Sequence, residues 1–202
     1  MTNDHKTPGT VSVIDDDLIL LEMMQDLLST IGVSVQTFSS ARQFLAEYRP
    51  SSCECLICDV RMPELNGMDL QKHLNAMKIA IPTIFISGFA EVEIAVSAMK
   101  HGAFDFLEKP FSKQVLLGKV QAALDASRLR NQQSRQESTK EARLSLLSAR
   151  ERSVINLVID GKTSKEISEQ LGIKLRTVES HRSRIFEKLH VRSTVELLKL
   201  VL

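Results

Sequence analysis

Short apolar runs alternate with longer amphipathic stretches through roughly the first 130 residues. The runs have the length of strands, and the stretches have the apolar spacing of helices that bury one face. Strands and helices that alternate in this way form βαβ units, whose strands lie parallel in one sheet. The sequence therefore predicts an α/β fold with a doubly wound, five-stranded parallel sheet. The expected strands are 11–14, 33–38, 55–58, 81–86 and 104–107, and the expected helices are 18–31, 41–48, 68–77, 91–99 and 113–129.

Charged side chains are distributed unevenly along the chain. Residues 1–127 carry 10 Lys and Arg against 16 Asp and Glu, whereas residues 128–202 carry 16 against 9. The asymmetry indicates an acidic domain followed by a basic one. A basic domain has the charge expected of a nucleic-acid-binding protein, and an acidic domain repels phosphate unless a cation intervenes. Aromatic residues make up only 4% of the chain, which argues against a platform that stacks single-stranded bases.

The start of the chain and the cysteines are uninformative about chemistry. The first ten residues contain no apolar segment of a signal peptide, and no run approaches the length of a membrane span. We therefore expect a cytoplasmic protein without membrane contact.

Cys53, Cys55 and Cys58 surround one expected strand, where they could form a redox or metal site or be buried core thiols. The core interpretation is favoured, because no further cluster of ligands follows them.

Polar side chains follow the expected strands of the acidic domain. Asp15 and Asp16 follow the first strand, Asp59 the third, Ser87 the fourth and Lys109 the fifth. Because parallel strands end at one edge of a sheet, we expect these groups to lie close together. Crowded carboxylates need a cation, and an oxygen-only ligand set favours Mg²⁺. With the metal bound, one carboxylate could attack phosphorus, and the lysine and hydroxyl could contact the phosphoryl oxygens. The alternative is that the aspartates only cap a helix and pair with Lys109.

Four motifs in this part resemble a known family. Val-Ile-Asp-Asp-Asp at 13–17, Cys-Asp-Val-Arg-Met-Pro-Glu-Leu-Asn-Gly at 58–67, Ile-Ser-Gly at 86–88 and Phe-Asp-Phe-Leu-Glu-Lys-Pro-Phe at 104–111 are similar to a bacterial response-regulator receiver domain. The ordered combination is specific, and it covers about 125 residues. The resemblance implies a five-stranded, flavodoxin-like receiver fold with a Mg²⁺-dependent phosphorylation site at the carboxyl edge of the sheet.

The resemblance also implies a role for each residue at that edge. Asp59 would accept the phosphoryl group, and Lys109 would contact it. Asp16, Asp59 and the backbone carbonyl of Arg61 would coordinate Mg²⁺, with Asp15 acting largely through water. The bond between Lys109 and Pro110 is cis in the family.

A switch and an output surface are implied as well. Ser87 would turn toward the phosphoryl group while Phe106 moves inward, which biases a two-state packing arrangement. The conformation of the surface at about 90–124 would then change, and two copies of the chain would form a homodimer through this surface. Within this surface, an apolar stripe at helical spacing is expected to belong to the core; it comprises Val92, Ala95, Val96 and Met99.

The basic part of the chain has the pattern of short helices separated by turns. Three capping boxes are expected, at Ser148 with Glu151, Thr163 with Glu166 and Ser193 with Glu196. Gly161 and Gly172 should end the first two helices. The turn at 171–174 separates a short helix from a longer one at about 175–190, which predicts a helix-turn-helix unit.

The basic part resembles the LuxR-type DNA-binding domain. The similar motifs are Leu-Ser-Ala-Arg-Glu at 147–151, Gly-Lys-Thr-Ser-Lys-Glu-Ile at 161–167, Leu-Gly-Ile at 171–173, Thr-Val-Glu-Ser-His-Arg at 177–182 and Lys-Leu-His-Val-Arg-Ser at 188–193. Lys174 stands where the family often has a Ser that caps the recognition helix, so that cap is expected to be missing or replaced by Thr177 or water. The resemblance implies contacts to double-stranded DNA from Lys162, Lys165, Lys174, Arg176, Thr177, Glu179, Ser180, His181, Arg182 and Ser183.

Together the two resemblances point to the NarL/FixJ subfamily of two-component response regulators. We expect a receiver domain at 8–127, a partly helical linker at 128–144 and a LuxR-type domain at 145–202. The implied partners are a sensor histidine kinase, promoter DNA and a second copy of the chain, with RNA polymerase as a further candidate. Such a protein accepts a phosphoryl group but is not a turnover enzyme.

Two other functions stay open at this point. A DNA-binding regulator that does not depend on phosphorylation would keep only the basic part active. An aspartyl-phosphate phosphohydrolase would use the same carboxylates, but such enzymes usually carry a second acid two residues after the nucleophile, where this chain has Arg61.

Overall fold

The chain divides into two compact units, residues 1–132 and 133–202. The structure, a computed structural model, describes residues 9–88 and 92–201. The division falls inside the stretch expected to be a linker. Residues 8, 89–91 and 202 and the side chain of Val92, which belong to predicted regions, lie outside the described part.

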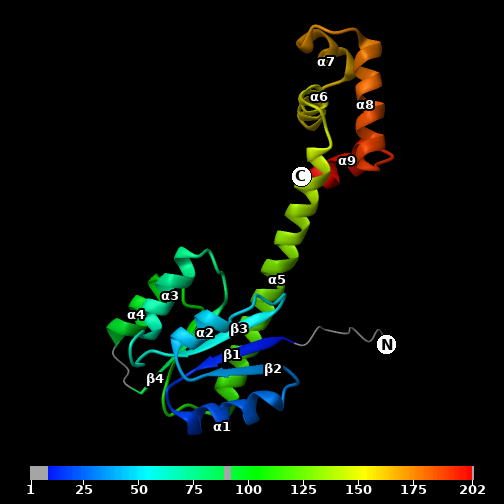
Figure 1. The fold of residues 1–202 in the computed structure, drawn as a ribbon. Helices are drawn as coiled ribbons and strands as arrows, with labels where there is room; N and C mark the ends of the chain where they lie inside the picture. Colours follow the sequence, from blue (N-terminus) through cyan, green and yellow to red (C-terminus); the bar gives the residue numbers. More distant parts are fainter. Residues whose placement is uncertain (1–8, 89–91, 202) are drawn as a thin grey trace. The chain divides into compact units, whose positions relative to one another are not determined.

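The first unit is built around a five-stranded parallel sheet with the strand order β2-β1-β3-β4-β5 (Figure 1). This confirms the predicted α/β fold. The strands are β1 Thr10–Ile14, β2 Ser34–Phe38, β3 Glu54–Asp59, β4 Thr83–Ser87 and β5 Asp105–Glu108. The helices that begin in this unit are α1 Leu18–Ser29, α2 Ala41–Glu47, α3 Gly67–Ala76, α4 Val92–Lys100 and α5 Lys113–Ser145.

Two apolar clusters cover the two faces of the sheet. On one face, α1 and α5 pack Leu21, Met24, Leu116 and Val120 against the strands. On the other face, α2, α3 and α4 pack their buried side chains in the same way. The central strands are buried on both sides, as expected where helices cover both faces of a parallel sheet.

The three cysteines belong to this core. Cys53, Cys55 and Cys58 are buried, form no disulfide and lie in or next to β3. Burial raises the pKa of the Cys55 and Cys58 thiols well above their ordinary value. The prediction that these residues are buried core thiols is confirmed.

The prediction that the apolar stripe on α4 belongs to the core is wrong for Val96 and Met99. Val96 and Met99 have 46% and 48% of their surface exposed, while Ala98 is buried and Ile94 packs against the core. Both faces of this helix carry apolar residues, so periodicity alone could not show which one faces the sheet.

Helix α5 is 33 residues long and continues to Ser145. It contains the whole stretch 128–144. Its buried residues, which extend from Leu116 to Ser127, all belong to the first unit.

Within the described residues of the second unit, which end at 201, four helices follow α5: α6 Ala149–Ile159, α7 Ser164–Leu171, α8 Leu175–Leu189 and α9 Thr194–Val201. Their buried side chains form one apolar cluster. The first two capping boxes are present as predicted. The third is only half formed, because Ser193 Oγ accepts from the Glu196 N–H but Glu196 Oε2 accepts from the Arg192 N–H.

The turns between these helices follow the predicted pattern. Gly172 adopts a left-handed conformation with φ of 64° and caps α7, and Gly161 has φ of 76° just after the end of α6. Lys174 provides no side-chain cap for α8. The predicted loss of that cap is confirmed.

Glu151 joins three segments of the second unit. Its side chain is only 3% exposed, and Oε2 accepts from Lys188 Nζ at 2.7 Å and from the Ser148 N–H at 2.8 Å. Lys188 also donates to the carbonyl oxygen of Leu146. The hydrogen bonds from Lys188 and Ser148 lower the pKa of Glu151 from 4.5 to about 2.

Glu151→Gln is expected to lower the free energy of unfolding of the second unit by about 2 kcal/mol at pH 7, because it removes the charge of a buried carboxylate that pairs with the partly exposed Lys188 and it weakens a cap. Since the pKa is lowered on folding, the contribution of Glu151 is complete above about pH 4.5 and is lost as pH falls toward 2. Hydrogen exchange of α6 and α8 amides between pH 2 and 7 measures this difference. The exposed Glu169→Gln is the control, and a pH-independent difference would contradict the argument.

Candidate functional site

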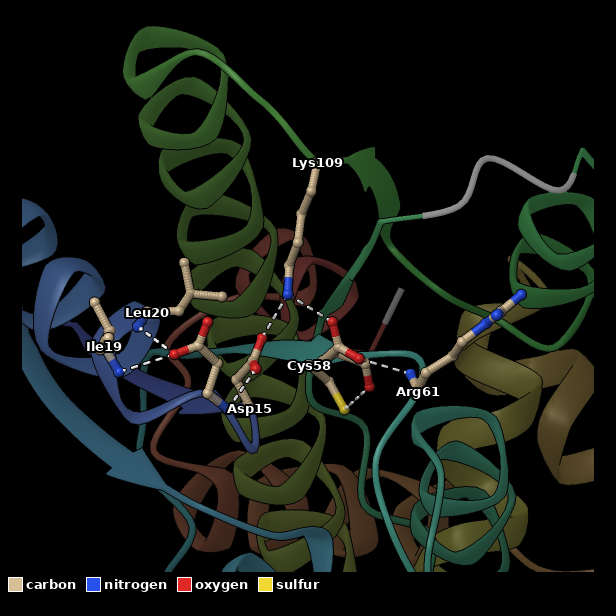
Figure 2. Close-up of polar contacts among 8 residues, drawn as sticks. Asp15, Ile19, Leu20, Cys58, Arg61 and Lys109 are labelled. Atoms are coloured by element: carbon tan, nitrogen blue, oxygen red, sulfur yellow. Dashed lines mark hydrogen bonds and ion pairs between the residues drawn. The ribbon is translucent and has the colours of Figure 1, made fainter.

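Two buried carboxylates share one lysine at the carboxyl edge of the sheet. Asp15 directly follows β1, Asp59 ends β3 and Lys109 directly follows β5. Lys109 Nζ lies 2.8 Å from Asp15 Oδ2 and 2.7 Å from Asp59 Oδ1 (Figure 2). The two aspartates are 1% and 6% exposed. Residues far apart in the sequence thus meet where the parallel strands end.

Burial and the lysine act on Asp59 in opposite directions. Burial raises the pKa of Asp59, while the hydrogen bond and charge of Lys109 lower it; the net shift is upward. Burial lowers the pKa of Lys109, but Asp15 and Asp59 outweigh this effect and raise it. Lys109 therefore stays protonated at neutral pH and favours the ionised form of Asp59 against the effect of burial.

Backbone N–H groups fix both carboxylates. Asp15 Oδ1 accepts from the Asp17 N–H at 2.9 Å, and Asp59 Oδ2 accepts from the Arg61 N–H at 2.6 Å. The side chain of Asp17 in turn accepts from the first N–H groups of α1 and caps that helix. The helix-capping interpretation of the acidic run therefore applies to Asp17, while Asp15 faces the lysine.

Gly67 allows α3 to start directly against β3. A Cβ at this position would lie 2.4 Å from the backbone oxygen of Asp59, 3.0 Å from the Phe85 ring and 3.1 Å from Cys58 Sγ. The Gly67 N–H also donates to the carbonyl oxygen of Val60. The loop between Asp59 and α3 is therefore closed by a contact that only glycine permits.

Ser87 and Phe106 lie on neighbouring strands near this site. Ser87 ends β4 and is 1% exposed, and its carbonyl oxygen accepts from the Lys109 N–H at 2.7 Å. Phe106 pairs in register with Phe85 and is partly buried against the core. The peptide bond between Lys109 and Pro110 is cis.

Asp16 differs from its neighbour Asp15. Its side chain is exposed and lines a cavity of about 830 Å³ together with Arg61. Within the described residues, no group of three His, Cys, Asp or Glu side chains is close enough to hold a metal ion. The oxygen donors fit Mg²⁺ in kind, and Asp15 and Asp59 already share one cation, but Asp16 is not gathered with them.

A second candidate site lies at the start of α8. A cavity of about 330 Å³ is lined there by Lys174, Arg176, Thr177, Ser180, His181 and Arg184. Val178, Ile185 and Leu189 of the same helix point into the core. Of the other residues expected to contact DNA, Lys162, Lys165, Glu179 and Ser183 are exposed.

Two cations of α8 are bound within the protein. Arg182 donates to the hydroxyls of Ser164 and Thr194, at 3.4 and 3.2 Å, and is partly buried. Lys188 donates to Glu151 and to the Leu146 carbonyl, as described above.

Arg184 was not among the DNA contacts expected from the sequence. It lies four residues after Ser180 and eight after Arg176, a spacing that places all three on one helix face.

Family models match both units. Residues 11–121 match the response regulator receiver domain, and residues 145–201 match the bacterial regulatory proteins of the luxR family. The response regulator protein TodT of Pseudomonas putida is 40% identical over 191 residues, which cover 95% of this chain and 84% of TodT. This chain belongs to the FixJ/NarL-like response regulators. The predicted subfamily is confirmed.

Other response regulators show the same relationship. The transcriptional regulatory protein FixJ of Azorhizobium caulinodans is 38% identical over 192 residues, with 95% of this chain and 91% of FixJ covered. The solved structure of the response regulator StyR matches with a TM-score of 0.87 and 40% identity over 96% of this chain and 98% of StyR. Full-length FixJ from B. japonicum matches with a TM-score of 0.59 and 35% identity, over 95% of each chain.

Among the helices that the structure describes in the present chain, none combines the length and the apolar character that a membrane span requires.

Proposed function

We propose that Asp59 accepts a phosphoryl group from a sensor histidine kinase and that this controls promoter binding by the LuxR-type unit. The chain is a two-component response regulator and a LuxR-family transcription regulator. The observation that carries the finer proposal is the Lys109 ammonium bound to both Asp15 and Asp59. The charge of Lys109 opposes the protonation of Asp59 that burial favours, and it holds a cation where phosphoryl oxygens would arrive.

In the transfer, an Asp59 oxygen attacks phosphorus, the P–N bond of the kinase phosphohistidine breaks and an acyl phosphate forms. Lys109 holds one carboxylate oxygen and the Arg61 N–H holds the other, so the carboxylate is oriented before the reaction. We assign Mg²⁺ to Asp15, Asp16, Asp59 and the Arg61 carbonyl, where it would neutralise charge on the phosphoryl group. Asp16 would have to approach the other two carboxylates.

The switch would use Ser87 and Phe106. Ser87 is buried beside Lys109, and Phe106 is only partly buried, so a change at the hydroxyl could be coupled to the packing of the ring. Val96 and Met99 of α4 and Val115 of α5 are exposed apolar side chains. They support a homodimer formed through the surface at 90–124.

DNA contact is proposed for the exposed start of α8. The cationic cavity lining there suits phosphate and base edges, as in helix-turn-helix proteins. Lys162, Lys165, Glu179 and Ser183 remain proposed contacts. We propose 8–127 as the receiver, 128–144 as the linker and 145–202 as the DNA-binding domain.

The proposal is tested by DNA-site selection from genomic fragments. Three samples are compared: protein treated with Mg²⁺ and acetyl phosphate, untreated protein, and treated Asp59→Asn protein. Enrichment of one sequence in the treated wild type alone is the expected result. Equal enrichment in all samples would leave a regulator that does not depend on phosphorylation.

Arg182 and Arg184 are expected to have different roles although both lie on α8. Arg184→Met should weaken DNA binding about tenfold and reduce the salt dependence, since a cation facing phosphate is lost. Arg182→Met should instead lower the stability of the second unit, because its bonds to Ser164 and Thr194 are lost. Binding titrations at several salt concentrations and thermal unfolding separate the two effects. If Arg182→Met instead weakened DNA binding and Arg184→Met lowered the stability, Arg182 would be the residue that contacts DNA.

A further inference from the structure

A cavity of about 410 Å³ lies at the edge of the sheet opposite to Asp59. Its walls come from the second half of α3, the residues that lead into β4 and β5, and Arg130 of α5. Because the strands are parallel, these leading residues lie at the amino edge, whereas Asp59 and Ser87 lie at the carboxyl edge. We call this space the Gln71 cavity; it is separate from the site of Asp59.

Gln71 lines this cavity and carries a buried acceptor without a partner among the described residues. Its side chain is only 4% exposed, and within the described part of the chain Gln71 Oε1 has no hydrogen-bond partner. A buried acceptor without a donor costs about 1–3 kcal/mol. Thr83 Oγ1 already donates to the Ile81 carbonyl, and Asn75 Nδ2 donates one of its two N–H groups to the His101 carbonyl. Since no described group donates to Gln71 Oε1, this acceptor is left for a molecule held in the cavity, either a water or a ligand.

Arg130 adds a positive charge to the rim. One of its guanidinium nitrogens donates to the carbonyl oxygen of Ala80 across the cavity mouth. A guanidinium has five N–H donors, so it can keep this bond and bind an anion as well. The described lining residues include no carboxylate that would oppose such an anion. The cavity thus offers one site for a negative group and one for a hydrogen-bond donor.

We propose that the Gln71 cavity binds a small organic anion that also carries a hydroxyl or amino donor, such as a hydroxycarboxylate. The anionic group would bind Arg130, and the hydroxyl would donate to Gln71 Oε1. The volume lies within the range of small-molecule sites, and polar groups converge in it from separate elements. The proposal does not depend on phosphorylation of Asp59.

Amide NMR of the full chain tests the proposal with three probes of similar size. L-Lactate has both groups, propionate lacks the hydroxyl, and propane-1,2-diol lacks the charge. We expect saturable shifts of the Ala80, Thr83 and Ala103 amides with L-lactate, at a dissociation constant on the order of 1 mM. Propionate and the diol should bind about tenfold more weakly or not at all, because each loses one of the two interactions.

Two variants and two controls complete the experiment. Gln71→Met removes the acceptor at similar volume, and Arg130→Met removes a surface cation with little risk to folding; each should weaken L-lactate binding about tenfold. Lys100→Met, outside the cavity, and Asp59→Asn should bind L-lactate as the wild type does. Shifts that persist in both Gln71→Met and Arg130→Met, or no saturable shift with any probe, would overturn the proposal. In the second case a trapped water satisfies Gln71.

Discussion

Lys109→Met is expected to lower the free energy of unfolding of the first unit by about 3 kcal/mol at pH 7 without Mg²⁺. Asp15 and Asp59 are almost fully buried and share this one ammonium group. Removing it leaves two buried negative charges without a counter-charge, which is among the more costly changes in a folded protein. Burial already raises the pKa of Asp59, and loss of the lysine would raise it further.

The pH dependence of this effect has a definite sign. A carboxyl whose pKa is higher in the folded than in the unfolded state stabilises the fold as pH falls, because the folded state binds more protons. The deficit of the variant should therefore shrink as pH falls from 7 toward the ordinary carboxyl pKa of 3.8. MgCl₂ should recover more stability in the variant than in the wild type.

Tyr48 is a convenient reporter for the measurement, since it is the single tyrosine in a chain without Trp and lies in the first unit. Urea unfolding followed by its fluorescence gives the free energy at each pH. Lys113→Met, an exposed lysine four residues later, is the matched control and should change little. A Lys109 variant as stable as this control at pH 7 would show that the carboxylates are neutral or hydrated in the native state.

Gly67→Ala is expected to cost about 3 kcal/mol. The new methyl would lie 2.4 Å from a backbone oxygen, and an oxygen held at the end of a central strand cannot rotate away as a flexible side chain can. Either α3 or the end of β3 must shift. Because that oxygen belongs to Asp59, labelling with acetyl phosphate should also become slower.

Gly118→Ala is the matched comparison. Gly118 lies within α5, and a Cβ there meets no atom within 4 Å. Alanine is the better helix former, so this variant should be about 0.5–1 kcal/mol more stable than the wild type. Opposite signs for the two substitutions in the same unfolding experiment would support the packing argument, and equal small effects would contradict it.

The sequence is most informative where one simple rule decides the geometry. Parallel strands end at one edge, so the order of strands and helices along the chain is enough to bring together the groups that follow β1, β3 and β5. Asp15, Asp59 and Lys109 meet as that rule predicts. The short capping motifs at Ser148 and Thr163 are equally predictable, because their hydrogen bonds span only three residues.

Features that depend on distant partners were not predictable. Arg182 and Arg184 are chemically identical and two residues apart, and only the position of Ser164 and Thr194 separates their surroundings. The prediction that the apolar stripe on α4 faces the core is wrong because this helix has apolar residues on two faces, and the sequence does not show which face packs against the sheet. The unpartnered oxygen of Gln71 follows from the places of four separate segments, which no local pattern records.

The three cysteines in and next to β3 have a practical consequence for studying motion. The thiols of Cys53, Cys55 and Cys58 are buried, and the raised pKa values of Cys55 and Cys58 keep them protonated and inert toward thiol reagents. A reagent can modify them only when the strand opens, so modification rates report the opening free energy of the segment that ends in Asp59. The receiver thus contains a built-in reporter of local unfolding at its central strand, and no label has to be engineered into it.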